Sequence, residues 1–309
     1  MHFDTWFSER SLVADSAIAA TLADLAARHA TYGPTAPCGC VPPTSATTRT
    51  GYWSSPTASP PTCCPTSPTT ATSSKRGYEQ LIDIWGADHR IRRPAQGRGP
   101  GLGHDAAEVE LILGQLVTLK RGGEEVKLSK RAGTIVTLSE VVEETGIDAT
   151  RFTFLLQSLD TRQTVDLAVM ASQAMENPVF YVQYAHARIA ALTRQAAANG
   201  VTRRPLDEVD LAPLGHEREL DVLRALHELP DIVALACNER APHKITTWVR
   251  ELAGAFHGFY HDCRIMGTDT DGQPVSDATT QARLWLTEAA RIGLVIGLGI
   301  LGVSAPESM

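Results

Sequence analysis

Apolar residues recur at every third or fourth position over the second half of the chain, which is the spacing of one face of an α-helix. From about residue 137 this spacing predicts five amphipathic helices with short connections, the pattern of a helical bundle. The polar stretch Asn199–Pro213 lacks the spacing and is predicted to be a loop. The most regular helix carries the apolar positions Ile245, Trp248, Val249, Leu252, Phe256 and Phe259.

Residues that favour helix starts support these boundaries. Thr137 followed by Glu140 predicts a capping box, in which each side chain accepts a hydrogen bond from the backbone N–H of the other residue. Asn177–Pro178 and Ala241–Pro242 each place a proline at a predicted first turn. The apolar faces expected for the other three bundle helices are Tyr181, Ala185, Ile189 and Leu192; Leu220, Leu223 and Leu226, before Pro230; and Ala282, Leu286, Ala289, Ile292 and Ile296, between about Asp277 and Leu298.

The first half of the chain has shorter patterns. Residues 7–28 have apolar positions at helical spacing and are predicted to form one helix. The apolar run Leu81–Trp85, ended by Gly86, is typical of a buried strand in a parallel sheet. Gly122–Gly123 separates the strand-like segments 111–119 and 125–128 and predicts a hairpin.

Bulk composition narrows the possible functions. A chain of 309 residues with 43% apolar and 20% charged residues can bury a sizeable core. The net charge of −7 gives no global attraction to nucleic acid and no DNA partner is predicted, although a local basic patch is enough to bind RNA. The chain has no run of 18 apolar residues and no signal-peptide pattern at its start, which predicts a cytoplasmic protein without a membrane span.

Residues 32–74 interrupt the globular pattern. They contain no Asp, Glu, Leu, Ile or Phe, but nine Pro and eighteen Ser or Thr among 43 positions, and are expected to be disordered. Cys38, Cys40, Cys63 and Cys64 lie here without the usual Cys-x2-Cys spacing or any His, so no metal site is predicted. The remaining cysteines, Cys237 and Cys263, are interpreted as small buried hydrophobic residues.

Two motifs carry a resemblance to a known family. Residues 127–134 have the sequence Lys-Leu-Ser-Lys-Arg-Ala-Gly-Thr, and residues 176–189 have the sequence Glu-Asn-Pro-Val-Phe-Tyr-Val-Gln-Tyr-Ala-His-Ala-Arg-Ile. In this order and spacing they resemble the arginine–tRNA ligases, which are class I aminoacyl-tRNA synthetases. Without the second motif, the first would better suit a solvated basic turn after a hairpin. The likeness covers 1–31, 75–89 and 102–309, but neither 32–74 nor 90–101.

The resemblance implies a fold class and a domain organisation. The fold class is an α/β remnant of a Rossmann-like class I synthetase catalytic domain followed by an all-α anticodon-binding helical bundle. Residues 1–31 and 75–150 would be the catalytic-domain remnants, the second of them with the signature loop. Residues 32–74 would be low-complexity sequence, either out-of-frame or disordered, and residues 151–309 would form the helical anticodon-binding domain.

The activity implied by the resemblance is ATP-dependent attachment of L-arginine to its tRNA through arginyl-adenylate, with Mg²⁺ accompanying ATP. Lysines suit such a site because they can neutralise charge that grows on the β- and γ-phosphates. The catalytic candidates are Lys127, Ser129 and Lys130, of which Lys130 would stabilise the transition state. The ATP-binding candidates, at the end of the predicted strand, are Gly86, Asp88 and His89.

Aromatic rings can stack on bases and arginine can clamp phosphates. The resemblance implies that Tyr184 and Arg188 face the tRNA, and they are the tRNA-binding candidates. Tyr181 is interpreted as a core residue instead, and His186 as a structural hydrogen-bond donor. Trp248, Phe256, Phe259 and Tyr260 are also interpreted as core.

The histidine-rich class I signature is missing, since the chain has no His-x-Gly-His string. We therefore expect a catalytically impaired ligase without its N-terminal half-site. One alternative is a non-catalytic tRNA-binding helical module from a truncated gene. Another is a helical scaffold unrelated to synthetases, which would leave 127–134 unexplained.

We interpret residues 32–74 and 90–101 as out-of-frame translation of a GC-rich gene, because family-like sequence stops and resumes without transition. The DNA for 32–74, translated in another frame, is expected to encode acidic and apolar family-like sequence. Resequencing this DNA checks the interpretation. Stop codons or equally featureless sequence in both alternative frames would mean that the segment is a genuine insertion.

Overall fold

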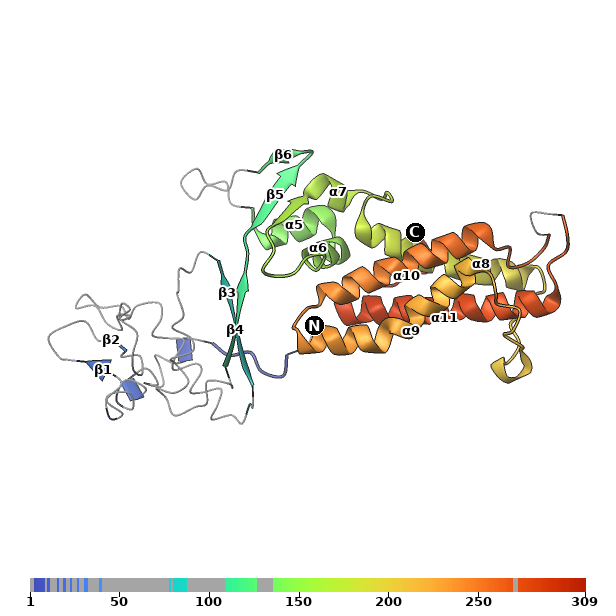
Figure 1. Ribbon diagram of the computed structural model, residues 1–309. Helices are drawn as coiled ribbons and strands as arrows, with labels where there is room; N and C mark the ends of the chain where they lie inside the picture. Colours follow the sequence, from blue (N-terminus) through green and yellow to red (C-terminus); the bar gives the residue numbers. More distant parts are fainter. Residues whose placement is uncertain are drawn as a thin grey trace. The chain divides into compact units, whose positions relative to one another are not determined.

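The computed structural model describes residues 78–87, 109–126 and 136–309, except 79 and 269–271, together with scattered positions before residue 41. The chain divides into two compact units, Met1–Leu116 and Val117–Met309 (Figure 1). Segments 32–74, 90–101 and 127–135 therefore lie outside the described residues, apart from Tyr32, Gly39 and Cys40.

The first unit contains a parallel pair of strands, as the apolar run predicted. Strand β3 (Leu81–Gly86) pairs with β4 (Val109–Gly114) in parallel, from Leu81 opposite Val109 to Gly86 opposite Gly114. The prediction that this strand is buried is wrong for one face, because Ile82 and Ile84 are 43% and 64% exposed. Parallel strands are buried by neighbouring strands and covering layers, and the described sheet contains two strands alone.

The predicted single helix over 7–28 is also wrong. Arg10–Ser11 and Ala19–Ala20 are helical, but Phe7 and Ser8 are not, and Ser16 has a left-handed φ of 55°. The Ser16 carbonyl accepts from the Ala20 N–H at 3.0 Å, so a second helical turn begins there. Serine favours such starts because its hydroxyl competes for backbone groups. Nearby, the two-residue strands β1 (Thr31–Tyr32) and β2 (Gly39–Cys40) pair antiparallel.

The second unit begins with a three-stranded sheet. Strand β5 (Val117–Arg121) pairs antiparallel with β6 (Glu124–Glu125) and parallel with β7 (Gln163–Asp166). The predicted hairpin is confirmed, and Gly122 and Gly123 have the positive φ values, 61° and 88°, that its two-residue turn requires. The expected single strand over 111–119 is wrong, because β4 and β5 divide it between two different sheets.

Three short helices accompany this sheet. The predicted capping box of α5 (Leu138–Thr145) is confirmed: the Thr137 N–H donates to the Glu140 carboxylate at 2.7 Å, and the Glu140 N–H to the Thr137 hydroxyl at 3.2 Å. Helices α6 (Ile147–Phe154) and α7 (Leu167–Ala171) were not predicted, because two turns or fewer give too little periodicity to detect. The proposed domain boundary between residues 150 and 151 falls inside α6.

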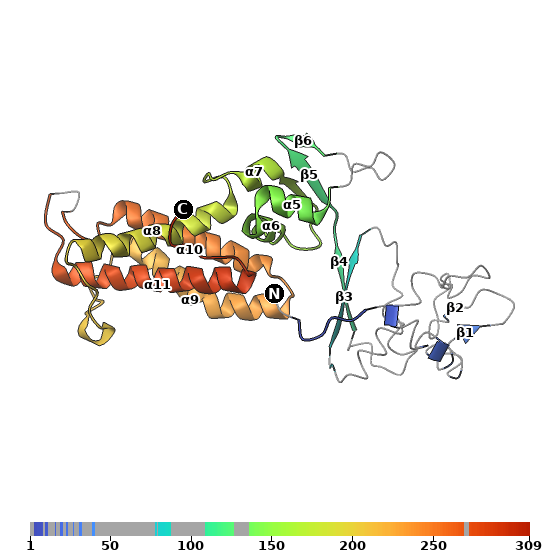
Figure 2. The ribbon, with the colours of Figure 1, turned by 180° about the vertical axis from the view of Figure 1, so that it is seen from behind.

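Four long helices form the bundle and lie alongside one another in both views (Figures 1 and 2). They are α8 (Pro178–Ala198), α9 (Glu217–Asn238), α10 (His243–Asp262) and α11 (Asp277–Leu301). The Asn177 side chain caps α8 by accepting from the Val179 N–H at 3.2 Å. The predicted loop over 199–213 is confirmed, with one 3₁₀ turn, η3 (Leu206–Glu208). The bundle prediction is confirmed with four helices, since α5 packs with α6 and α7 instead.

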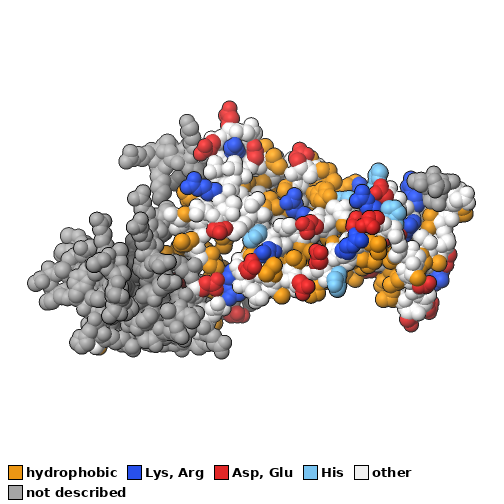
Figure 3. All heavy atoms as spheres, viewed as in Figure 1, with side chains coloured by type: hydrophobic (Ala, Val, Ile, Leu, Met, Phe, Trp, Pro, Cys, Tyr) orange, Lys and Arg blue, Asp and Glu red, His pale blue; other side chains and the backbone are white. Residues whose placement is uncertain are grey.

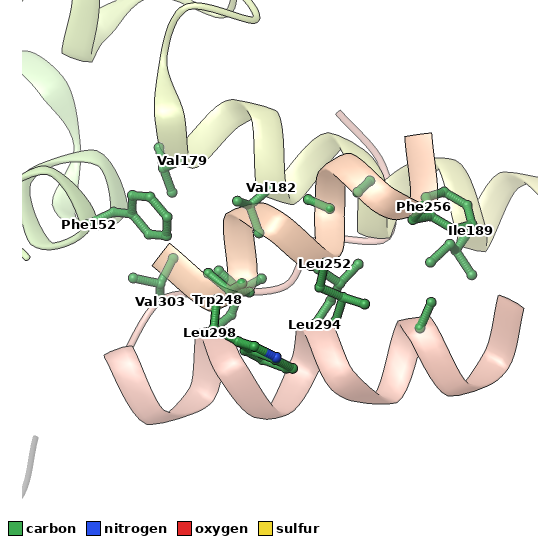
Figure 4. Packing of buried hydrophobic residues seen from close by; sticks show 14 of the residues in the cluster. Phe152, Val179, Val182, Ile189, Trp248, Leu252, Phe256, Leu294, Leu298 and Val303 are labelled. Atoms are coloured by element: carbon green, nitrogen blue, oxygen red, sulfur yellow. The ribbon is translucent and has the colours of Figure 1, made fainter. Parts of the chain in front are cut away.

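Helix α10 supplies the centre of the core (Figure 4). All six of its predicted apolar positions are at most 2% exposed. The Trp248 indole N–H donates to the Ala225 carbonyl of α9 at 2.7 Å, so its polar atom is satisfied inside the core. Tyr181 of α8 is half-buried against the same cluster, as expected.

The predicted apolar face of α11 is wrong over its second half. Ile292 and Ile296 are 45% and 43% exposed, whereas Gly293 and Gly297 are buried. A Cβ at Gly293 would lie 2.7 Å from Leu226. These glycines allow close approach of neighbouring helices, and a count of apolar side chains misses them.

Pro230 lies inside α9, and the helix continues beyond it to Asn238. Proline removes one backbone hydrogen bond, but apolar residues on both sides of it, such as Leu226 and Val233, pack against the core. Cys237, near the end of this helix, is exposed rather than buried. Cys263 is buried as expected, and its burial raises the pKa of the thiol to about 11.

Helix α11 is long and apolar enough to cross a membrane by length and composition alone. Half of its most apolar stretch is buried inside the protein. Its Leu294 and Leu298 point toward Trp248 and Leu252 of α10 in Figure 4. We therefore interpret α11 as a core helix of the bundle.

Gly297→Ala is expected to destabilise the protein by about 1–3 kcal/mol, because its methyl group would overpack the core. The new Cβ would lie 2.8 Å from the Trp248 ring and 2.9 Å from Val249. The matched control is Gly299→Ala on the same helix, where no atom lies within 4 Å of the new Cβ. That substitution should stabilise by about 0.5–1 kcal/mol through helix propensity. Urea unfolding measures both, and destabilisation of equal size at the two positions would contradict the packing explanation.

Candidate nucleic-acid interface

Helices α8 and α10 bring aromatic and basic side chains together on one side of the bundle. Tyr184 and Arg188 are one helical turn apart on α8, and His257 and Tyr260 are one turn apart on α10, so each pair shares a helix face. With Tyr181, these residues form what we call the aromatic–arginine cluster. Its members come from segments more than 60 residues apart in the sequence, so the packing of the bundle positions them.

The Arg188 guanidinium lies between two tyrosine rings. Its Cζ is 4.6 Å from the centre of the Tyr184 ring and 4.8 Å from that of the Tyr260 ring. One guanidinium nitrogen, Nη2, also donates to the Tyr184 hydroxyl at 3.0 Å. Cation–π attraction to both rings therefore adds to a hydrogen bond in holding this side chain.

His257 holds the other side of the guanidinium. Its Nδ1 lies 3.3 Å from Arg188 Nη1, and its Nε2 lies 3.3 Å from the Tyr181 carbonyl oxygen. Because a carbonyl accepts and a guanidinium donates, the proton sits on Nε2 and Nδ1 accepts. Burial lowers the pKa of His257, the Arg188 charge lowers it further, and the bond to Tyr181 opposes both effects.

The structure brings Tyr184 and Arg188 together, as their shared motif suggested, and adds two residues. Tyr260 was interpreted as core, but it is 37% exposed. Adjacent helical positions point about 100° apart, so Tyr260 cannot follow the fully buried Phe259 into the core. His257 had no signal in the sequence, because its role depends on the neighbouring helix.

His186 acts as the structural donor that was expected. Its side chain is buried, and its Nδ1 lies 2.8 Å from the Pro306 carbonyl oxygen. Because a carbonyl oxygen can only accept, Nδ1–H is the donor. This bond holds the C-terminal segment against α8. The same segment is fixed at Ser304, whose carbonyl accepts from Gln183 at 3.0 Å and whose N–H donates to Asp148 at 3.2 Å.

A cavity of about 290 Å³ adjoins the cluster. It is lined by the junction of α5 and α6, the connection between α7 and α8, the first turns of α8, and Met309. Phe180 lines it as well, and the Phe180 ring stacks on Tyr184 at 5.9 Å between ring centres. Asn177, Gln183 and Asp148 supply polar groups along its wall. Phe180 thus contacts the cluster on α8 and also lines the cavity.

Charged side chains of both signs are interspersed over the face of the bundle shown in Figure 3. Many of the arginines are paired with carboxylates, such as Arg218 with Asp262 at 2.8 Å and Arg224 with Glu217 at 2.9 Å. Arg188 differs from these, since its described contacts are tyrosine rings, a hydroxyl and a neutral histidine. Its positive charge is therefore less neutralised by the protein.

The nucleotide-binding candidates are described only in part. Gly86 ends β3 directly opposite Gly114, the end of β4, and the Ala87 N–H donates to the Gly114 carbonyl at 2.8 Å. The other candidates, Asp88, His89, Lys127, Ser129 and Lys130, lie outside the described residues. No group of three metal-ligating side chains occurs among the described residues.

The hairpin that leads into residue 127 is held by Asp166, which the sequence did not single out. Its carboxylate accepts from the Gly122 N–H at 3.1 Å and the Gly123 N–H at 2.8 Å. It also caps α7 by accepting from the Ala168 N–H at 3.0 Å. These bonds lower the pKa of Asp166, the one to Gly123 most strongly. The turn and the start of α7 are thus fixed to one carboxylate.

Arg188→Met is expected to raise the pKa of His257, because it removes both a nearby positive charge and the donor that favours the neutral ring. NMR titration of the imidazole measures this, with the His257 signal assigned by its loss in His257→Asn. The control is Arg250→Met, which removes an exposed arginine of α10, the helix that carries His257. This substitution should leave the pKa of His257 unchanged. An unchanged His257 pKa in Arg188→Met would mean that the two side chains do not interact in solution.

Comparisons with known proteins agree with this architecture. Residues 182–309 match the DALR anticodon binding domain, a span that contains α9–α11 and most of α8. The chain is 39% identical to the arginine–tRNA ligase of Frankia alni over 312 residues, covering 100% of this chain and 56% of that protein. It is 45% identical to the arginine–tRNA ligase of Carboxydothermus hydrogenoformans over 239 residues, covering 76% of this chain and 41% of that protein.

A solved structure is also similar to this chain. A Campylobacter jejuni protein described as an arginyl-tRNA synthetase superposes with a TM-score of 0.84 at 27% identity, over 100% of this chain and 65% of that chain. The chain spans about half the length of the curated relatives that it matches. Over this shared length, the chain is similar to the arginine–tRNA ligases, and its residues 182–309 match the DALR anticodon binding domain.

Proposed function

We propose that this chain binds arginine tRNA through the aromatic–arginine cluster, as part of the machinery that attaches L-arginine to that tRNA. The observation that carries the proposal is the position of Arg188 between Tyr184 and Tyr260, in a segment that matches an anticodon-binding domain. Stacking of an unpaired base on an aromatic ring contributes about 1–3 kcal/mol. A guanidinium without a carboxylate partner can add a phosphate or base-edge contact.

The overall reaction that we propose is the ATP-dependent formation of arginyl-adenylate followed by transfer of arginine to the tRNA. Mg²⁺ would accompany ATP and neutralise phosphate charge. Gly86 fits an ATP site because nucleotides bind beyond the carboxyl ends of parallel strands, and β3 and β4 both end in glycine. Asp88 and His89, which follow it in sequence, would complete that contact. Lys127, Ser129 and Lys130 would act on the triphosphate.

We further propose that this chain catalyses adenylate formation poorly. Its sequence has no His-x-Gly-His string, and each missing transition-state donor would cost about 3–4 kcal/mol. The alignment with the Frankia protein takes in all 309 residues within 312 positions, which supports replacement rather than insertion at 32–74 and 90–101. Residues 1–31 and 75–150 would then be remnants of the catalytic domain, and 151–309 the anticodon-binding domain. A cytoplasmic location fits the proposed role in translation.

The second candidate is a purely non-catalytic tRNA-binding module. The observation that favours it is that all five members of the cluster lie within one compact unit, Val117–Met309. Binding can survive the loss of catalysis, because the transition state requires every donor at once.

The experiment compares filter binding of arginine tRNA and a non-cognate tRNA with arginine-dependent pyrophosphate exchange. We expect a preference for the cognate tRNA, and Arg188→Gln should weaken cognate binding about tenfold, equivalent to one stacking or charged contact. The exposed Arg250→Gln on α10 is the matched control for loss of one positive charge. Equal loss in both variants would mean general charge attraction rather than recognition at the cluster.

Pyrophosphate exchange then separates the two candidates. Weak exchange that disappears in Lys130→Ala would support a residual ligase. Complete absence of exchange with intact tRNA binding would support the non-catalytic module. Exchange at an ordinary synthetase rate would contradict the proposed impairment, and absence of cognate preference would contradict the proposed binding function.

A further inference from the structure

His257 links the two helices that form the aromatic–arginine cluster. Its Nδ1 accepts from Arg188 and its Nε2 donates to the Tyr181 carbonyl, both at 3.3 Å. Its ring also meets the Tyr181 ring edge-on, with 4.9 Å between centres and an angle of 66° between planes. The two hydrogen bonds fix the proton of this imidazole, and together with the ring contacts they fix its position.

The fixed imidazole restricts Arg188 in turn. A free arginine samples many rotamers, and ordering such a side chain on binding costs free energy. In this structure Nη2 is held by Tyr184, Nη1 by His257, and the guanidinium carbon by two rings. Removal of the His257 acceptor would leave one side of the guanidinium without its hydrogen bond.

We propose that neutral His257 is a positioning residue for RNA binding, which holds Arg188 between Tyr184 and Tyr260 and releases it when the imidazole is protonated. The ligand is a single-stranded stretch of tRNA that meets Arg188 with a base or a phosphate. This inference rests on the proposed function of the cluster, and adds that binding there weakens in mild acid. Protonation converts Nδ1 from an acceptor to a donor and places two positive charges side by side.

Helix α8 places the Arg188 charge beside His257, and this charge favours the neutral ring. The rings of Tyr181 and Tyr184, also from α8, contact the imidazole, and Tyr260 lies one helical turn away on α10. Helix α9 contributes Arg218, which lies against the neighbouring Gly258 and pairs with Asp262.

The direction of the pH effect follows from these surroundings. The pKa of His257 is lowered in the folded protein, by burial first and by Arg188 in addition. The ring is therefore neutral above the ordinary histidine pKa of about 6.5. As the pH falls below that value, protonation is increasingly opposed by the fold, and it breaks the Arg188 contact once it occurs.

The test uses two substitutions at this position in the full chain. His257→Asn places a non-titrating oxygen acceptor near the position of Nδ1, whereas His257→Phe keeps a ring without any acceptor. Affinity for an arginine tRNA transcript is measured at constant salt between about pH 5.5 and 7.5, the range in which histidine titrates. His227→Asn, an exposed histidine on α9, is the control for general effects of histidine charge. Circular dichroism at each pH verifies that the variants are folded.

Between about pH 7.5 and 5.5, we expect the tRNA affinity of the wild type and of His227→Asn to fall about tenfold more than that of His257→Asn. His257→Asn should bind within about threefold of the wild type near neutral pH and show a flat profile, and His257→Phe should bind about tenfold more weakly throughout. The NMR signal of the Arg188 Nε–H group should broaden in His257→Phe without RNA, because the side chain loses a fixed partner.

Two results would overturn the inference: an acid profile in His257→Asn identical to that of the wild type, or full affinity and an unchanged Arg188 signal in His257→Phe. Either can occur while Arg188→Gln still weakens binding, and the proposed function of the cluster then stands. If Arg188→Gln and Tyr184→Leu both bind tRNA as the wild type does, the proposed function fails and this inference fails with it.

Discussion

Burial of one face of α10 is the constraint on which the second unit depends. This helix packs against α8, α9 and α11, and its side chains Trp248, Leu252 and Phe256 are almost completely removed from water. Large apolar side chains of this kind contribute about 1.5–3 kcal/mol each when buried. Helix α11 can approach them because it presents glycine at positions 293 and 297. The bundle is thus built from bulky residues on one helix facing small residues on another.

The same helix also determines the candidate interface. Phe256 and Phe259 point into the core. The residues directly after them, His257 and Tyr260, are rotated by about 100° about the helix axis and therefore point away from the core. The rotation of α10 about its own axis is therefore fixed by the core, and that rotation positions two members of the cluster. Interface geometry and core packing are two consequences of one helix orientation. Mutations in the core can alter the cluster without touching it.

Much of this organisation was accessible from sequence, for identifiable physical reasons. Long helices with strong periodicity, such as α8 and α10, and local signals such as Thr137 with Glu140 depend on residues close together in the chain. Contacts between distant segments were not accessible, and they include the bond of His257 to Arg188 and the bonds of Asp166 to the hairpin turn. The exposed Ile292 and Ile296 were wrongly placed on the buried face of α11, because periodicity counts apolar side chains and ignores a packed glycine. Tyr184 and Arg188 were singled out through their motif, but Tyr260 required the orientation of α10.

The joint between the β5–β6 hairpin and α7 has a consequence for how this protein can vary. Asp166 is held by backbone N–H groups of Gly122, Gly123 and Ala168, and backbone donors stay in place whichever side chain is present. Positive φ values at both glycines restrict what can replace them, but the donors themselves are insensitive to mutation. Sensitivity of these hydrogen bonds to substitution is therefore concentrated in a single side chain, that of Asp166. A longer carboxylate would displace the turn from the helix, and an amide would bring its own N–H groups against donors.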